Sequence, residues 1–553
     1  MSTFAAISDN ALATSAIFLA LLTTPFSTTL SANNQTDRML GAGESLEGSL
    51  DANHPITIRL NAIEGDYIRG QFTGQDATLS LVDSNQAPVR RLAKGNGERE
   101  SFYFVLPQEN SVRLHITSAV PTTVELELAS IVPASEQMPP PQSPASPRLK
   151  ALQRSIARGE NTQSFWNEIE SSGAPLVEYE NVTPPLADDE ALVTFLYRGA
   201  KNRAQVFSAP SGDHDEMVRL ENTDVWYASY RVPRSARLSY KLAPDVPQLN
   251  ESFWDRRRAI LATAQLDPLN PHSFPEHPVD RFAGESVLEL PSAPAQPWLE
   301  SEPKIPTGSV TPHRITSDIL GNTRNVFVYR PSGYQSDDPD NALMVVFDGE
   351  RYVNDVDVPH ILDRLIAAKQ IPPTAAILIS NPSQASRSKE LPCNPDFARF
   401  LSDELMPWAR QEHLTADRSR TVVAGASYGG LAAAYIGLTL PEIFGNAYCQ
   451  SGSFWWSPGA KPGSPQADPE WLTRQFVSAD VSDVNFYLEA GSFEDHGDTS
   501  IFKSTRHLRD VLQAKGFQVQ HREYASGHGY YYWRYNFPNG VIALLGDAHD
   551  NKE

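Results

Sequence analysis

Three residues in the second half of the chain have the types and the order needed for nucleophilic catalysis. Ser427 lies within Gly425-Ala-Ser-Tyr-Gly429, a Gly-x-Ser-x-Gly pattern, and Glu494 and His528 follow it along the chain. A serine hydroxyl becomes a good nucleophile when a histidine removes its proton, and a carboxylate holds that histidine in the required tautomer. We therefore expect Ser427 to attack a carbonyl carbon, with His528 as general base and Glu494 as its acid partner.

The segments beside Ser427 support this interpretation. Thr421-Val-Val-Ala424 is an apolar strand, and Leu431-Ala-Ala-Ala-Tyr-Ile436 favours a helix. A strand, a sharp turn and a helix in that order expose the nucleophile of α/β-hydrolases, and the glycines leave room where a Cβ would clash. The alternative is an ordinary glycine-rich turn between a strand and a helix.

Glu494 and His528 each fall on a loop that follows a predicted strand, in the order that this fold requires. Asp495 and Asp498 lie in the same loop as Glu494 and are alternatives for the acid, because spacing does not separate the three. Three other histidines are interpreted as surface or strand residues, namely His496, His507 and His521.

An oxyanion hole needs two donors that point at the developing negative charge. The N–H of Tyr428, directly after the nucleophile, is one candidate. The second is expected in the loop after the apolar strand Leu343–Phe347, where Gly349 and Glu350 are the candidates. A plain Asp-Gly turn is the alternative for that loop.

Strands alternate with segments of helix length from residue 306 to residue 553, which predicts an α/β domain with a largely parallel sheet. Helices are expected near residues 358–368 and 397–411. The expected strands are 325–329, 342–347, 375–379, 420–424, 485–489 and 518–524.

The first half of the chain is rich in short alternating runs, which are typical of β-sandwiches. We expect a small β-sandwich over residues 36–133 and an Ig-like domain with its connector over residues 153–305. Residues 134–152 contain Met138-Pro-Pro-Pro-Gln-Ser-Pro-Ala-Ser-Pro147 and are expected to be an extended linker. The expected fold class is thus an α/β-hydrolase domain preceded by two β-sandwich domains.

Composition excludes several classes of function. The chain has 553 residues and a formal net charge of −21, which disfavours nucleic acid or an anionic membrane as a partner. Only Cys393 and Cys449 are present, so neither a disulfide framework nor a multi-thiolate metal site is available. We see no clustered metal ligands in the sequence and expect no cofactor.

Residues 1–35 contain an apolar run, Ala13–Phe26, followed by small residues, as in a signal peptide. The run lacks a basic segment before it, and Asp9 precedes it. We expect a periplasmic or secreted protein, and the alternative is a disordered leader on a cytoplasmic one.

From about Thr162 to its end the chain resembles the enterochelin (ferric enterobactin) esterases. The runs Glu390-Leu-Pro-Cys-Asn394 and Ser451-Gly-Ser-Phe-Trp-Trp456 are the most specific to that family. Shorter matches occur at 165–166, 223–226, 267–271, 347–350, 387–389, 422–431, 441–445, 488–491 and 533–534. Two features depart from the family: the sandwich before residue 133, and Gly529 where an aspartate is expected.

The resemblance implies hydrolysis of a trilactone catecholate siderophore, with iron entering as part of the substrate. Such an anionic, aromatic ligand calls for cationic and aromatic side chains. Arg387, which matches a family motif, is the first candidate contact, with a surface salt bridge as its alternative. Further candidates are Trp455, Trp456 and Trp533, for which core packing is the alternative.

The expected function is therefore that of a serine esterase acting on the esters of a ferric, enterobactin-like siderophore. One alternative is a feruloyl or acetyl esterase of carbohydrate esters that uses the same triad, with the sandwiches as glycan-binding modules. The other alternative is a siderophore-binding protein with a vestigial catalytic site.

Overall fold

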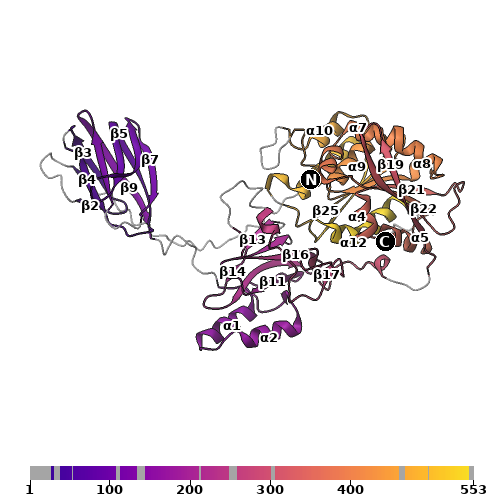
Figure 1. Cartoon of the computed structure of the whole chain (residues 1–553), viewed down its shortest axis with the longest axis horizontal. Helices are drawn as coiled ribbons and strands as arrows, with labels where there is room; N and C mark the ends of the chain where they lie inside the picture. Colours follow the sequence, from indigo (N-terminus) through magenta and orange to yellow (C-terminus); the bar gives the residue numbers. More distant parts are fainter. Residues whose placement is uncertain are drawn as a thin grey trace, which may run out of the picture. The chain divides into compact units, whose positions relative to one another are not determined.

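The chain divides into two compact units, Met1–Ser143 and Pro144–Glu553. The computed structural model describes residues 27–29, 38–52, 54–107, 112–133, 143–208, 210, 213–247, 258–300, 305–459, 468–495 and 497–546 (Figure 1). The signal peptide expected within residues 1–35 lies outside the described residues, apart from the strand β1. No helix in the described ranges is both long and apolar enough to cross a membrane.

The first unit is built from strands around one hydrophobic core. The long strand β5 (Tyr67–Val82) pairs through its first half with β7 and β9 and through its second half with β6 and β8. Apolar and polar residues alternate along these strands, so Phe72 and Leu79 are fully buried while their neighbours face outward. The other strands are β1 (Ser27–Thr29), β2 (Arg38–Leu40), β3 (Ser45–Leu50), β4 (Ile56–Leu60), β6 (Pro88–Asn96), β7 (Glu100–Val105), β8 (Arg113–Ser118) and β9 (Thr122–Val132).

The linker expected over residues 134–152 is shorter than predicted. Helix α1 (Pro147–Ala157) occupies its last part, and residues 134–142 lie outside the described residues. The Ser146 hydroxyl accepts a hydrogen bond from the Leu149 N–H at 3.1 Å, and Pro147 lies in the first turn. A proline in that position starts a helix rather than preventing one, because the first N–H groups have no partner within the helix.

A second β-rich region contains two antiparallel sheets that share one core. Val193 and Phe195 of one sheet and Leu238 and Tyr240 of the other are fully buried together. The first sheet comprises β10 (Leu176–Glu178), β11 (Glu190–Arg198), β14 (Val218–Arg219) and β15 (Val225–Pro233), beside helix α2 (Gln163–Ser172). The second comprises β12 (Ala204–Ser208), β13 (Asp213–Glu216), β16 (Arg237–Pro244), β17 (Ser273–Phe274) and β18 (Glu285–Glu289).

An eight-stranded sheet forms the centre of the C-terminal domain, in the order β19-β20-β22-β21-β23-β24-β25-β26. The first three strands in this order pair antiparallel, and all other neighbours pair parallel. The strands are β19 (Ser309–Ser317), β20 (Asn322–Arg330), β21 (Ala342–Phe347), β22 (Thr374–Ile379), β23 (Thr421–Ala426), β24 (Asn446–Gln450), β25 (Asn485–Gly491) and β26 (Gln518–Tyr524). Each strand expected from the sequence in this domain is confirmed.

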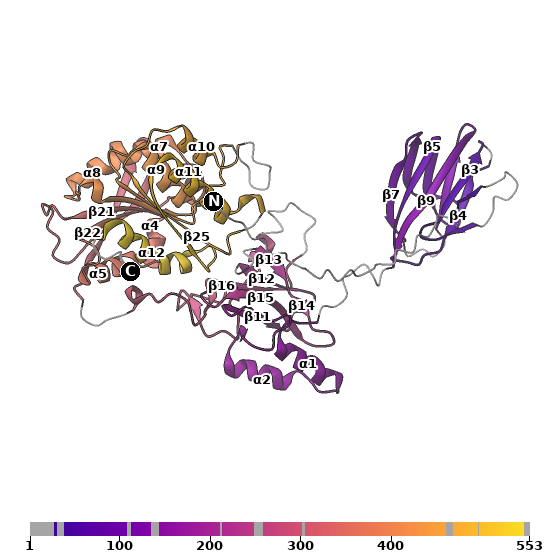
Figure 2. The ribbon, with the colours of Figure 1, turned by 180° about the vertical axis from the view of Figure 1, so that it is seen from behind.

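Helices cover both faces of this sheet, as Figures 1 and 2 show from opposite sides. Leu343 and Val345 of β21 belong to the core on one face, whereas Met344 and Val346 belong to the core on the other. One face carries α7 (Pro395–Arg399), the π-helical η3 (Phe400–Leu405), α8 (Met406–Gln411), α9 (Tyr428–Thr439), α10 (Trp471–Ser478) and α11 (Ile501–Lys515). The other face carries α4 (Gly349–Asn354), α5 (Val358–Ala367) and α12 (Tyr530–Leu545). The domain is therefore α/β-hydrolase-like, as expected.

Helix α12 also joins this domain to the second β-rich region. Tyr531 and Tyr532 are buried in the core of that region. The Tyr532 hydroxyl accepts a hydrogen bond from the Ser239 N–H at 2.5 Å, and the Arg237 N–H donates to the Ala525 carbonyl at 3.0 Å. These contacts flank the loop that carries His528, so the β-rich region helps to fix that loop.

Candidate active site

Ser427 lies in a strained turn between β23 and α9. Its backbone has φ +58° and ψ −119°, a conformation that side-chain-bearing residues rarely adopt and that costs about 1–3 kcal/mol. A Cβ on Gly425 would lie 2.7 Å from the carbonyl carbon of Gly429, so the turn requires glycine there. The Ser427 N–H donates to the Gln450 carbonyl at 3.0 Å. The turn thus holds the Ser427 hydroxyl at the carboxyl ends of the parallel strands.

His528 and Glu494 are in direct contact. The Nδ1 atom of His528 lies 2.6 Å from Oε1 of Glu494, whose other oxygen accepts the Gly491 N–H at 2.6 Å. Glu494 is buried, with 4% of its surface exposed. A carboxylate in that position accepts the Nδ1 proton and leaves Nε2 free to take a proton from a hydroxyl.

The competing candidates have other partners. Asp495 is exposed and accepts from the Ser500 hydroxyl and the Lys503 ammonium, each at 2.8 Å. His507 lies in α11 and pairs with Glu470, and His521 lies within β26. The sequence predicted a helix position for His507 and a strand position for His521. The side chain of Asp498 and the whole of His496 lie outside the described residues.

Ser427 and His528 line one pocket of about 480 Å³. Ser453 is a site residue that was not predicted from the sequence, and its hydroxyl lies 3.3 Å from that of Ser427. Its membership of the Ser451–Trp456 run was the available signal. The other lining residues are Asp348, Glu350, Arg351, Ser380, Asn381, Ser383, Gln384, Arg387, Tyr530 and Trp533.

The loop after β21 has the position expected for a second oxyanion donor. Gly349 is buried and begins α4, while the Glu350 N–H already donates to the Ser380 hydroxyl at 3.1 Å. Tyr428 begins α9, so its N–H belongs to the first turn, where backbone donors have no acceptor within the helix.

Arg387 lines the pocket but is bound to Asp348. Its Nε and Nη2 atoms each lie 2.7 Å from a different oxygen of Asp348, which also accepts from Asn381 at 2.6 Å. Burial opposes the charged form of Arg387, but the hydrogen bonds and charge of Asp348 outweigh it and raise its pKa. The ion pair is buried rather than on the surface, with 16% and 4% of the two side chains exposed.

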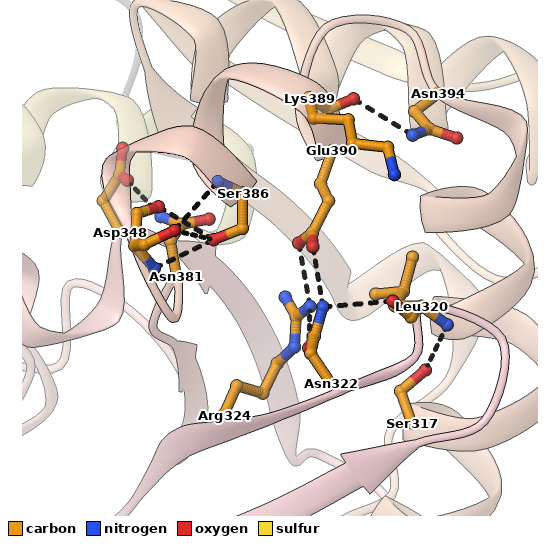
Figure 3. Close-up of polar contacts among 11 residues, drawn as sticks. Ser317, Leu320, Asn322, Arg324, Asp348, Asn381, Ser386, Lys389, Glu390 and Asn394 are labelled. Atoms are coloured by element: carbon orange, nitrogen blue, oxygen red, sulfur yellow. Dashed lines mark hydrogen bonds and ion pairs between the residues drawn. The ribbon is translucent and has the colours of Figure 1, made fainter.

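Helix α6 (Gln384–Glu390), which carries Arg387, is anchored at both ends (Figure 3). At its start, Ser383 and Ser386 form a capping box. At its end, Glu390 accepts from Arg324 and Asn322, each at 2.8 Å, in the domain interior. These contacts fix the position of Arg387 beside the pocket.

The three predicted tryptophans have different surroundings. Trp533 is buried and lines the pocket. Its ring packs edge-on against the His528 ring, with 4.9 Å between the ring centres, and its indole N–H donates to the Ser451 hydroxyl. Trp455 is half-buried beside the Tyr428 ring at 6.3 Å. Trp456 packs against the hydrophobic core, as its alternative interpretation predicted. Of these three tryptophans, only Trp533 lines the pocket in the described part of the chain.

Arg351 and Tyr530 also line the pocket and were not identified from the sequence. The Arg351 guanidinium lies 4.3 Å above the Tyr530 ring and pairs with Asp355 at 2.5 Å. Burial raises the pKa of Asp355, whereas the charges of Arg351 and Arg534 lower it. Arg351 follows the Asp-Gly-Glu sequence directly, which was the only signal for its position.

A second buried acid, Glu489, lies behind the site. It accepts from the Tyr448 hydroxyl at 3.0 Å and from Gln450 at 2.8 Å, and burial raises its pKa to about 8. Gln450 also donates to the Trp533 carbonyl and accepts from the Tyr352 hydroxyl. This network connects the backbone partner of Ser427 to the helix that packs on His528.

The described ranges contain two cysteines and no cluster of metal ligands. Cys393 and Cys449 are both buried and unpaired. Within those ranges, no three or more His, Cys, Asp or Glu side chains lie together as metal ligands. The arrangement of Ser427, His528 and Glu494 is suited to acyl transfer.

Two family models match the chain. Residues 192–299 match the family described as "Enterochelin esterase, N-terminal", and residues 317–544 match the family described as "Putative esterase". The second region contains every residue of the pocket described above.

Curated relatives cover most of the chain. An iron(III) salmochelin esterase of Escherichia coli O6:H1 is 32% identical over 72% of this chain and 98% of its own. An iron(III) enterobactin esterase of Dickeya dadantii is 29% identical over 69% of this chain and 93% of its own.

Solved structures agree with these relatives. The ferric enterobactin esterase of Salmonella typhimurium matches with a TM-score of 0.56 and 27% identity, over 69% of this chain and 98% of that one. The enterobactin esterase of Shigella flexneri, crystallised in the presence of enterobactin, matches with a TM-score of 0.54 and 30% identity, over 69% and 97%.

Proposed function

Because this chain belongs to the enterochelin esterase family and is a carboxylic ester hydrolase, we propose that it hydrolyses the esters of a ferric catecholate siderophore. The observation that carries the proposal is the site itself. Ser427 and His528 line one pocket, and the buried carboxylate of Glu494 lies 2.6 Å from His528.

In the proposed mechanism His528 takes the Ser427 proton through Nε2 as the serine oxygen attacks an ester carbonyl. Glu494 accepts the Nδ1 proton and stabilises the imidazolium. His528 then gives the proton to the departing alkoxide, which leaves as an alcohol and produces an acyl-enzyme. A water molecule, deprotonated by His528, releases the acid and restores Ser427.

The oxyanion that forms in each step needs two N–H donors. We assign these to Tyr428 and Gly349, because the N–H of Glu350, the other candidate, is already donated to Ser380. Ser453, next to the nucleophile, fixes the resting orientation of the Ser427 hydroxyl.

The pocket suits an anionic aromatic substrate. Arg351 supplies a positive charge at the pocket wall, and Tyr530 and Trp533 supply aromatic faces. Arg387 contributes mainly by holding Asp348 and the adjacent loop, since its Nε and Nη2 atoms donate to that carboxylate and Nη2 also donates to the Ala426 carbonyl. Trp455, whose ring centre lies 6.3 Å from that of Tyr428, remains a candidate contact.

We also make two proposals about the rest of the chain. The first is that both β-rich regions are sandwich modules, a role supported in the second by its two sheets around one core. The second is export to the periplasm or the exterior. N-terminal sequencing of the mature protein would test it, because a cytoplasmic protein would retain its leader.

The decisive experiment is mass spectrometry of the products formed from ferric enterobactin by wild type and by Ser427→Ala. We expect linear trimer, dimer and monomer from the wild type, and a loss in kcat of about 10⁴-fold or more in the variant. Ser336→Ala, which alters an exposed serine, is the matched control. Wild-type turnover of a feruloylated sugar in preference to ferric enterobactin, or binding of the siderophore without turnover, would contradict the proposal.

A further inference from the structure

A second hollow of about 840 Å³ lies where helix α12 meets the second β-rich region. Its walls come from the segment that links α2 to β10, from strands β17 and β18, and from α12. Three aromatic side chains contribute, and their rings form a continuous row. Phe274 lies 5.6 Å from Tyr531, which lies 5.1 Å from Tyr535. We call this hollow the α12 groove.

The α12 groove and the catalytic pocket share the first turns of α12 as a wall. Tyr530 and Trp533 line the pocket, whereas Tyr531, Arg534 and Tyr535 line the groove. A helix with its side chains is only about 10–12 Å across. A ligand held at Ser427 that extends beyond the pocket therefore has the groove within one helix diameter.

Arg534 distinguishes the groove from other surface hollows. The neighbouring arginines each have an ion-pair partner: Arg351 pairs with Asp355, Arg148 with Glu168 and Arg237 with Glu289. Among the described residues, Arg534 makes no hydrogen bond and no ion pair, although it is only partly exposed.

Neither of the two acidic residues that line the groove forms an ion pair with Arg534. Glu289 is shared with Arg237, which lies 2.9 Å away, and Glu276 is exposed on the loop after β17. A guanidinium that has no ion-pair partner among the described residues and lies beside a row of aromatic rings fits an anionic aromatic group. Arginine combines charge, a planar donor edge and a stacking face.

The chemistry of the substrate gives such a group a reason to be there. A trilactone presents one ester to Ser427 at a time, and its catecholate arms, which bind one iron together, extend away from that ester. We propose that the α12 groove binds a catecholate arm of the same ligand, with Arg534 as its cationic contact. This inference rests on the proposed function and adds the residue that distinguishes a multi-arm substrate from a single-arm one.

Steady-state kinetics of Arg534→Gln on two substrates tests the inference. The substrates are the ferric trilactone and a methyl ester of one catecholate-serine unit, which has no second arm. We expect KM for the ferric trilactone to rise about tenfold, as for loss of one hydrogen bond to a charged group, with kcat within about twofold. KM for the single-arm ester should not change.

Two further variants control for structure and for bulk charge. Arg534→Lys keeps the charge and should give a KM for the trilactone between those of wild type and Arg534→Gln. Arg522→Gln removes an exposed arginine of β26 that likewise has no ion pair in the described part of the chain, and it should match wild type.

The outcomes separate this subsite from the proposed function. An unchanged KM for the trilactone, equal changes for both substrates, or a fall in kcat alone would overturn the subsite while leaving the esterase function intact. A wild type that fails to hydrolyse the ferric trilactone would overturn the proposed function, and the subsite with it.

Discussion

The first unit and the C-terminal domain bury different kinds of residue. In the described part of the first unit, residues 38–133, Asp66 is the only buried polar or charged side chain, and it accepts the Ile63 N–H at 2.9 Å. The C-terminal domain buries many. They include Arg324, Asp348, Glu390, Glu489 and Glu494, each with at least one polar partner.

This difference indicates which positions in each region must keep their residue type. Burial of a charge costs free energy that a partner only partly offsets, so a domain selected for stability alone has no reason to accumulate buried charges. The first unit needs only the alternation of inward apolar and outward polar residues. The C-terminal domain adds buried polar pairs that hold residues of the pocket, such as His528 with Glu494 and Arg387 with Asp348. We expect the domain to be most sensitive to substitution at those pairs.

Apart from replacement of Ser427 itself, the largest effect is expected at Glu494. Glu494→Gln leaves one acceptor oxygen for two donors, the His528 Nδ1–H and the Gly491 N–H, and no charge to stabilise the imidazolium. We expect kcat on ferric enterobactin to fall about 10³- to 10⁴-fold, in steady-state assays, with the fold retained by circular dichroism.

Asp495→Asn is the matched control for this prediction, because it changes the next residue, an exposed carboxylate held by Lys503. It should retain nearly all activity. If Asp495→Asn were the more damaging of the two, the assignment of the acid would have to move to the exposed side of the loop.

The sequence predicted most of the fold of this domain, and it supplied the candidates for the proposed triad. Strands β21 and β26 begin and end at the residues expected, because apolar or alternating runs are bounded there by turn-forming residues. Ser427 and His528 were identified because strand order fixes where such residues follow their strands. Both kinds of signal are local in the chain.

Contacts between distant residues were not predictable in the same way. Periodicity says nothing about which carboxylate Arg387 meets, and its partner Asp348 is 39 positions away in sequence. The same holds for Glu494 against Asp495, where the course of one loop decides which side chain points inward. From the sequence, Arg534 is only part of the motif at 533–534, and its position on a groove follows from the packing of α12 against a separate sheet.

The next largest effect is on stability, at the buried pair Glu390 and Arg324. Glu390→Gln leaves the Arg324 charge fully buried without a counter-charge, which should cost about 3–5 kcal/mol in the free energy of unfolding. All nine tryptophans lie in the second unit, so fluorescence during denaturation reports that unit alone. Because Glu390 anchors the end of α6, the same measurement reports how much that anchor contributes to the free energy of unfolding.

The first unit supplies the comparison for this pair. Glu127→Gln breaks an exposed ion pair with Arg99, and the cost there should be about 0–1 kcal/mol, measured by circular dichroism at β-sheet wavelengths. Equal costs in the two units would contradict the view that buried polar pairs set the sensitivity of the C-terminal domain.

A smaller, pH-dependent effect is expected at Glu489. Burial raises the pKa of Glu489 to about 8 from 4.5, so the folded state keeps a proton that the unfolded state loses across this window. Stability should therefore fall as pH rises from about 4.5 to about 8, by about 3 kcal/mol at pH 7 from this group. Glu489→Gln should flatten that part of the pH profile in denaturation experiments.

Glu442→Gln, which removes an exposed carboxylate of the same domain, is the control and should leave the slope of stability against pH unchanged. A Glu489→Gln variant whose stability has the wild-type pH dependence would show that Glu489 does not hold its proton in the folded protein.

The smallest effect is expected from removing the first unit altogether. Neither family model includes residues before 192, and every residue of the catalytic pocket and of the α12 groove lies in Pro144–Glu553. A chain that begins at Pro144 should retain kcat and KM for ferric enterobactin within about twofold, as for changes at distant, independent sites. A rise in KM of more than tenfold with kcat preserved would instead assign the first unit a part in holding the substrate. Its β-rich core would then serve binding despite the scarcity of buried polar groups.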